Sequence, residues 1–211
     1  MIPVEMQVEP SSFNQKVQQP GKLFLQQVPR PRSNEWIGHS YWQKILPEMR
    51  IAYRRTCAYC AQWIPHGTGR HSVDHFLPRY THPELAYEWK NFRYVSARFN
   101  SRKSTREILD PFQIEQDWFM IDFSSFFIRP NPDLPSHIQQ RVKHTIQELK
   151  LNDDEDLVRE RQDHVCCYCL GEISLSYLER RAPFIAYELK RQGLVEEIKV
   201  RLAGICTELR F

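Results

Sequence analysis

The sequence predicts an α+β fold, in which a small module of two strands and a helix is embedded in a mostly helical body. Residues 72–77 and 91–96 are rich in β-branched and aromatic side chains, as short strands are, and the residues after Ala97 have a helical pattern. Apolar residues recur at helical spacing in several later segments. A chain of 211 residues is long enough for one substantial core or two small ones.

The first 35 residues predict an extended N-terminal arm, 1–35, with little structure of its own. They contain many Gln and Pro, including Pro20-Gly21 and Pro29-Arg30-Pro31, and show no sustained periodicity. Such an arm either wraps the body or engages a partner. A helical region is expected after Ser40, with Pro47 kinking it or starting a new first turn.

Two further regions follow the arm. Residues 36–110 are expected to form the strand and helix module with a flanking helix, and residues 111–211 a mainly helical region that packs on it. Within this second region, residues 118–128 suggest strand or core filler. Helices are expected after Ser136, from near Asp153 or Asp154, and from Pro183 to Gln192, where Gly193 acts as a stop.

Composition limits the classes of function. The hydrophobic content of 41% is that of a globular protein. No run of about 18 apolar residues is present, and the first ten residues resemble no secretory signal, so we expect no membrane contact and a cytoplasmic location. The chain carries no Walker A loop, so it should not hydrolyse ATP itself.

The distribution of charge is more informative than the net charge of +3. Six cations and no acidic residue lie between Trp89 and Arg106, whereas residues 152–160 are mostly acidic. The basic run is either an ordinary solvated helix face or a contact for phosphates. We expect phosphate contacts from Arg98, Arg102 and Lys103, with Arg79 ranking behind them.

The six cysteines are grouped rather than spread like a disulfide framework. Cys57 and Cys60 form a C-x-x-C pair, Cys166, Cys167 and Cys169 form a cluster, and Cys206 stands alone. This spacing favours metal binding over oxidation. The alternative is that these residues are small buried hydrophobes, and Cys206 is expected to be inert.

Residues 73–103 contain the groups that phosphodiester hydrolysis requires. His75 has a side chain suited to act as a general base near neutral pH. Asp74 is a hard oxygen ligand of the kind that Mg²⁺ prefers, and Asn100 can add a carbonyl oxygen. Successive side chains alternate along a strand, so Asp74 and His75 can serve one site only at a twist or a strand end.

The ordered set Cys57-x-x-Cys60, Asp74-His75, Asn91 and Asn100 followed by Lys103 resembles the ββα-metal motif of the HNH endonuclease superfamily. The resemblance covers about residues 57–104. It implies that His75 is the general base and that Asp74 and Asn100 hold a catalytic Mg²⁺ or Mn²⁺. It also implies that Asn91 tethers the loop and orients the histidine.

The chain departs from this motif at one point. Many HNH proteins carry a second C-x-x-C pair that completes a structural zinc site, and here Ser96 and Phe99 occupy its places. Structural Zn²⁺ takes four ligands, so the missing pair would have to come from elsewhere. Our hypothesis is a zinc site in which Cys57 and Cys60 are joined by Cys169 and by Cys166 or Cys167.

A narrower resemblance is carried by HPELAYEWKNFRYVSARFNSRKS, ILDPF and DWFMIDF. These segments resemble standalone bacterial HNH proteins, among them the nuclease subunit of Septu-type antiphage defence systems, which works with a separate ATPase. DNA is the default substrate that the superfamily implies, and RNA stays open. Two alternatives remain: a catalytically silent, zinc-stabilised adaptor, and a subunit that is inactive until an ATPase partner activates it.

Overall fold

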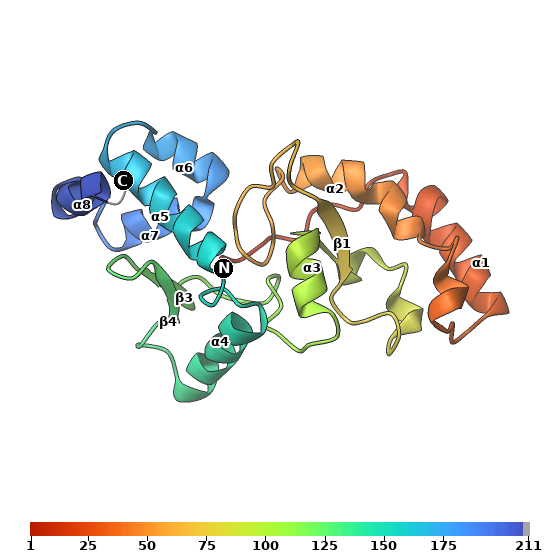
Figure 1. Ribbon diagram of the computed structural model, residues 1–211. Helices are drawn as coiled ribbons and strands as arrows, with labels where there is room; N and C mark the ends of the chain where they lie inside the picture. The colour runs from red at the N-terminus through yellow and green to blue at the C-terminus, as the bar shows by residue number, and fades with distance from the viewer. Residues whose placement is uncertain (209–211) are drawn as a thin grey trace. The chain divides into compact units, whose positions relative to one another are not determined.

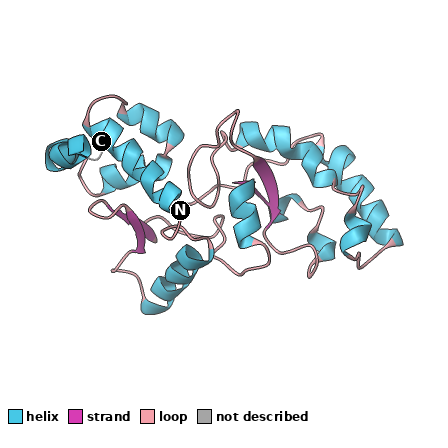
Figure 2. Ribbon diagram, viewed as in Figure 1, coloured by secondary structure: helices cyan, strands magenta, loops and turns pink. Residues whose placement is uncertain are grey.

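The computed structural model describes residues 1–208, apart from the side chains of residues 203–205, 207 and 208. The chain divides into two compact units. Unit 2 comprises Val4–Tyr59 and Ile64–Phe112, and unit 1 comprises Met1–Pro3, Cys60–Trp63 and the chain from Gln113 onward. Helices dominate, and the strands form two antiparallel pairs, which confirms the α+β prediction (Figures 1 and 2).

Part of the predicted arm is helical, so the expectation of an extended segment was wrong there. A π-helical turn, η1 (Asn14–Gln18), leads into α1 (Gln19–Gln27). The apolar side chains that this stretch buries are Phe13, Val17 and Phe24. Pro20 lies in the first turn of α1, where a missing backbone N–H leaves no helical hydrogen bond unmade. Many polar residues separate these apolar residues, so their helical spacing was not recognised in the sequence.

The segment after the arm forms short helices that carry large aromatic residues. These are η2 (Ser33–Trp36), η3 (Tyr41–Ile45) and α2 (Leu46–Ala52). Pro47 lies in the first turn of α2, as one of the two sequence alternatives expected. Trp36 and Trp42 are both buried, with ring centroids 6.0 Å apart, and they form one wall of the core of unit 2.

A hairpin followed directly by a helix lies at the centre of unit 2 (Figure 1). β1 (His71–His75) pairs antiparallel with β2 (Phe92–Ser96), and α3 (Ala97–Lys103) begins where β2 ends. The loop between the strands contains the short turns η4 (Pro83–Leu85) and η5 (Trp89–Asn91). The predicted order of strand, long loop, strand and helix is therefore confirmed.

Unit 1 combines one hairpin with five helices among its described residues. The hairpin is β3 (Phe119–Asp122) with β4 (Phe127–Pro130), and the helices are α4 (Ser136–Glu148), α5 (Glu155–Cys169), α6 (Leu175–Arg181), α7 (Pro183–Arg191) and α8 (Glu197–Glu208). The three predicted helices correspond to α4, α5 and α7. The Asp154 side chain caps α5 by accepting from the backbone N–H of Leu157, as its acidic start suggested.

Two helices of unit 1 were not predicted. Helix α6 was missed because only Ala182 separates it from α7. Helix α8 was missed because its apolar residues form only a weak amphipathic pattern. Among the residues described, no helix is both long and apolar enough to cross a membrane.

Candidate active site

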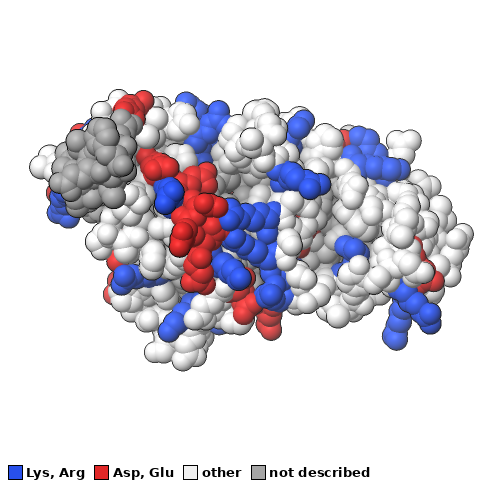
Figure 3. All heavy atoms as spheres, in the orientation of Figure 1, with Lys and Arg blue, Asp and Glu red and all other residues white. Residues whose placement is uncertain are grey.

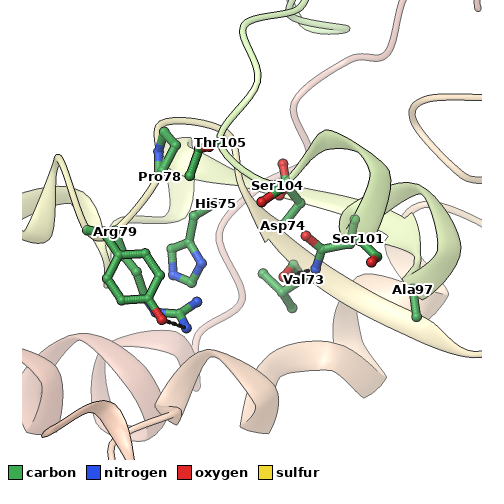
Figure 4. Close-up of a pocket in the computed structure, with 11 residues that line it drawn as sticks. Val73, Asp74, His75, Pro78, Arg79, Ala97, Ser101, Ser104 and Thr105 are labelled. Carbon is green, nitrogen blue, oxygen red and sulfur yellow. Dashed lines mark hydrogen bonds between the residues drawn. The ribbon is translucent and has the colours of Figure 1, made fainter. Parts of the chain in front are cut away.

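A cavity of about 390 Å³ opens in unit 2 between the end of β1 and the side of α3. Asp74, His75 and Asn100 all line it, so the structure brings together the three side chains that the sequence assigned to the reaction. Figure 4 labels Asp74 and His75 in this lining. β1 ends at His75, which meets the requirement that Asp74 and His75 lie at a strand end.

The imidazole of His75 is buried and oriented by a backbone carbonyl. Its Nε2 lies 2.9 Å from the carbonyl oxygen of Ala86. A carbonyl only accepts hydrogen bonds, so Nε2 carries the hydrogen and Nδ1 of the neutral ring keeps its lone pair. Burial lowers the pKa of His75 to about 3, which keeps the ring neutral at pH 7 and makes it a weaker base than a free imidazole. The rings of Trp42 and Phe92 contact it edge to face, at centroid distances of 4.6 and 5.3 Å.

Asn91 closes the loop between the strands. Its Oδ1 accepts from the backbone N–H of Leu77 at 2.8 Å, and its Nδ2 donates to the carbonyls of Leu77 at 3.0 Å and Leu85 at 3.2 Å. Leu85 precedes Ala86, whose carbonyl holds His75. Asn91 therefore ties the loop together next to the carbonyl that His75 contacts, and its orienting role stays a prediction.

Asp74 is 3% exposed and has two partners. The hydroxyl of Tyr59 donates to its Oδ2 at 2.5 Å, and the ammonium of Lys103 lies 3.1 Å from the same oxygen. Lys103 also donates to the backbone carbonyl of His75 at 3.0 Å. Burial raises the pKa of Asp74, against the opposing effects of Lys103 and Tyr59. The acid is therefore fixed in place by groups from α3 and from the segment before β1.

The amide of Asn100 spans from α3 to β1. Its Nδ2 donates to Ser72 Oγ at 2.6 Å and to the carbonyl of Val73 at 3.1 Å. Since Val73 offers only an acceptor, the amide nitrogen must face it, and Oδ1 is left as the acceptor end. Carboxylate and carbonyl oxygens are the ligands that Mg²⁺ and Mn²⁺ prefer. Asp74 and Asn100 therefore carry oxygen donors of the kind that suits a hard divalent cation, and the Lys103 ammonium is already paired with Asp74.

The basic run does not form one surface. Arg98 is exposed and Arg102 is half-buried, and Lys and Arg side chains gather over the region of α3 in Figure 3. Lys103, in contrast, is 0% exposed and pairs with Asp74, so the expectation that it contacts phosphate from the surface is corrected. Its position is explained by the helix: Lys103 is one turn beyond Asn100 and faces β1 with it.

The cysteines do not assemble as the zinc hypothesis required. Cys166 is joined to Cys206 by a disulfide between α5 and α8, so Cys166 offers no thiolate and Cys206 is not inert. Among the described residues, no three His, Cys, Asp or Glu side chains cluster in a way that would hold a metal. The proposed zinc set with Cys60, Cys166 and Cys169 is therefore not supported by the geometry.

Cys57 lies beside one of the two positions, Ser96 and Phe99, at which the sequence resemblance would expect a second cysteine pair. It is buried, and its Sγ accepts from the backbone N–H of Ser96 at 3.4 Å. Ser96 is one of the two positions where many HNH proteins have the second cysteine pair. Ser96 therefore offers Cys57 a backbone N–H donor and no second thiolate.

No family model matches this chain. Over 92 residues it is 28% identical to the Septu protein PtuB of Bacillus thuringiensis. The alignment covers 42% of this chain and 35% of that protein, so the chain spans about a third of the length of the curated relative it matches. The similarity supports a relationship to a Septu protein, whereas membership of the HNH superfamily stays a prediction from the residue pattern.

Three residues that position the site were missed in the sequence. Tyr59 holds Asp74, Ser72 holds Asn100, and Trp42 packs against His75. Tyr59 lies inside the Cys57-x-x-Cys60 pair, and Ser72 is two residues from Asp74, so proximity to the motif was an available signal for both. Trp42 lies 33 positions before His75, and nothing in the sequence connects the two.

Proposed function

We propose that this chain is a metal-dependent nuclease of the HNH type that hydrolyses phosphodiester bonds, with DNA as its substrate. The observation that carries the proposal is the meeting of three groups in one cavity: a neutral imidazole with Nδ1 as its acceptor, the buried carboxylate of Asp74 and the amide of Asn100. General bases, oxygen ligands and an accessible cavity are what such hydrolysis needs.

The residues of the chain divide the work as follows. His75 Nδ1 takes a proton from water while the water oxygen bonds to phosphorus and the bond from phosphorus to the 3′ oxygen breaks. Asn91 keeps the loop closed and so holds the carbonyl that orients His75. Asp74 and Asn100 would hold Mg²⁺ or Mn²⁺, which when bound neutralises charge on the phosphate and the leaving oxygen. Arg98 and Arg102 would bind backbone phosphates.

The biological setting we propose is antiphage defence. The similarity to the Septu protein PtuB supports this role. Since the sequence has no Walker A loop, any ATP hydrolysis in such a system would come from a separate ATPase partner. Activity that appears only in complex with that partner would make this chain a regulated subunit.

A second candidate is a catalytically silent nucleic-acid-binding or protein-binding adaptor. Two observations favour it: Asp74 is already paired with the buried ammonium of Lys103, and Ser96 and Phe99 replace a cysteine pair. A silent module would keep the fold of the site and its basic residues but would not hydrolyse nucleic acid.

Cleavage of supercoiled plasmid separates the two candidates. The wild type, His75→Ala and the control His144→Ala, which alters an exposed histidine of unit 1, would be compared in Mg²⁺, Mn²⁺ and EDTA. We expect metal-dependent cleavage by the wild type and the control, and a loss of about 100-fold or more in His75→Ala because the general base is gone. Equal cleavage by His75→Ala would refute the mechanism. Absence of cleavage in all three, alone and with an ATPase partner, would favour the adaptor.

A further inference from the structure

Arg79 lies in the loop after β1 and lines the same cavity as Asp74, His75 and Asn100. Its guanidinium group is surrounded by aromatic rings. The Cζ atom is 5.5 Å from the ring centroid of Trp36, 5.0 Å from that of Trp42 and 4.7 Å from that of Tyr80. Aromatic faces attract a cation without cancelling its charge, because the ring contributes a quadrupole and not an anion.

The guanidinium has donors that its surroundings do not use. Nη2 donates to the hydroxyl of Tyr80 at 3.0 Å, whereas the buried Nε has no hydrogen-bond partner among the residues described. A buried donor without a partner is costly and is therefore uncommon. By contrast, the buried cations Arg93 and Lys103, which contact the β1–β2 hairpin, are matched by the carboxylates of Asp110 and Asp74.

Trp42 connects Arg79 to the proposed general base. Its ring contacts the guanidinium on one side and meets the His75 ring edge to face at 4.6 Å. Figure 4 shows Arg79 and His75 close together in the cavity, with Asp74 and Ser104 across from them. The position of the cation relative to the imidazole is therefore set by a rigid side chain that both groups share.

We infer that Arg79 is a catalytic residue that binds the non-bridging oxygens of the scissile phosphate. The inference rests on the proposed function and adds the group that contacts the substrate. A guanidinium presents parallel N–H donors that match two phosphate oxygens, and the aromatic rings fix its orientation before substrate binds. Charge builds up on those oxygens as water attacks, and a fixed cation stabilises it without reorganisation.

The other cations are less suited to this contact. Lys103 is buried beneath Asp74, and Arg98 and Arg102 lie on α3 outside the lining of the cavity. They fit backbone phosphates away from the bond that breaks. Arg79 is the cation that shares the cavity lining with His75 in the described part of the chain.

The test is single-turnover cleavage of DNA in Mn²⁺ by the wild type, Arg79→Ala, Arg79→Lys and the control Lys44→Ala. Lys44 also lies over an aromatic ring, Tyr41 at 5.0 Å, but it is exposed and outside the cavity lining. We expect Arg79→Ala to lower the cleavage rate about 100-fold and Arg79→Lys about 10-fold, with Lys44→Ala unchanged. The concentration of DNA at half-maximal rate should change less than the rate itself.

Two readouts separate this role from a structural one. Thermal unfolding shows whether each variant is folded, and added guanidinium ion should restore part of the rate in Arg79→Ala by entering the vacated space. Wild-type cleavage rates in both Arg79 variants would overturn the inference about Arg79 and leave the proposed function standing. The same holds for a rate loss that accompanies a lowered melting temperature and is not rescued by guanidinium ion. A wild type without metal-dependent cleavage, both alone and with an ATPase partner, would overturn the proposed function, and the role of Arg79 with it.

Discussion

Asp74 and Arg93 are direct partners in the antiparallel register of β1 and β2, yet each forms its closest ion pair with another residue. Arg93 pairs with Asp110, and Asp74 pairs with Lys103. The two ion pairs thus lie at neighbouring positions of one small hairpin, and all four side chains are buried. The difference between them shows how a buried charge that supports a fold can be told from one that serves a site.

The pair of Arg93 and Asp110 is saturated. Two parallel hydrogen bonds join them, Nε to Oδ1 at 2.8 Å and Nη2 to Oδ2 at 2.6 Å. Nη1 donates to the carbonyls of Lys90 and Phe92, and the carboxylate also accepts from the backbone N–H of Phe112. Two parallel hydrogen bonds hold the pair in one geometry, and few donors or acceptors are left for a ligand.

The pair of Lys103 and Asp74 is less constrained and lies beside a cavity. A lysine ammonium is a point charge on a flexible stem, and here it is shared between Asp74 and the carbonyl of His75. Asp74 itself lines the cavity. A buried acid with a raised pKa at a cavity is a candidate functional group, whereas a matched pair such as Arg93 and Asp110 is a support for the fold.

The largest expected effect belongs to the saturated pair. Asp110→Asn leaves the buried guanidinium of Arg93 without a counter-charge, so the free energy of unfolding should fall by about 3 to 5 kcal/mol. Urea denaturation followed by tryptophan fluorescence measures this change. Cleavage per folded molecule should stay at the wild-type level. A change below about 1 kcal/mol would show that this pair does not support the fold as described.

The next largest effect is a pH dependence of the free energy of unfolding, which comes from His75 at the cavity end of the hairpin. Burial lowers the pKa of His75 to about 3, below its ordinary value in the unfolded chain, so the unfolded state binds more protons between these values. The free energy of unfolding should therefore fall as pH falls, by about 2 to 3 kcal/mol between pH 6.5 and 4.5 from this residue. The measurement compares metal-free wild type with His75→Gln, and parallel curves for the two proteins would contradict it.

The smallest effect is expected at Lys103. Lys103→Met removes the ammonium from Asp74, but the Tyr59 hydroxyl still donates to the carboxylate, so we expect a loss of about 1 to 3 kcal/mol. Mn²⁺ should then stabilise this variant more than the wild type, because no ammonium competes for Asp74. Thermal unfolding with and without Mn²⁺ measures the difference. Equal stabilisation of the two proteins would place the metal elsewhere.

The sequence predicted the parts of the molecule in which order along the chain decides structure. The succession of strand, loop, strand and helix follows from local composition, and the ordered Asp74, His75, Asn91 and Asn100 fall in one cavity and its supporting loop because this succession places them there. The start of α5 was predicted because Asp154 carries a capping signal that is itself local.

The sequence could not show the choices that depend on tertiary packing. Six cations between Trp89 and Arg106 indicate a basic surface, but burial of Arg93 and Lys103 depends on where Asp110 and Asp74 lie in space. The disulfide between Cys166 and Cys206 joins two helices, one of which was not predicted. Tyr80, the next residue in the chain, is one aromatic contact of Arg79, but the other two come from Trp36 and Trp42, more than 35 positions earlier.

The most direct test of the account is the binding of Mn²⁺ to the wild type, Asp74→Asn and Asp110→Asn, measured by isothermal titration calorimetry on folded protein. It requires neither substrate nor an ATPase partner. If Asp74 is a metal ligand, the wild type and Asp110→Asn bind one Mn²⁺ with similar affinity, and Asp74→Asn binds it at least about 10-fold more weakly. Unchanged binding by Asp74→Asn, or no binding by the wild type, would contradict the assignment of this cavity as a metal-dependent active site.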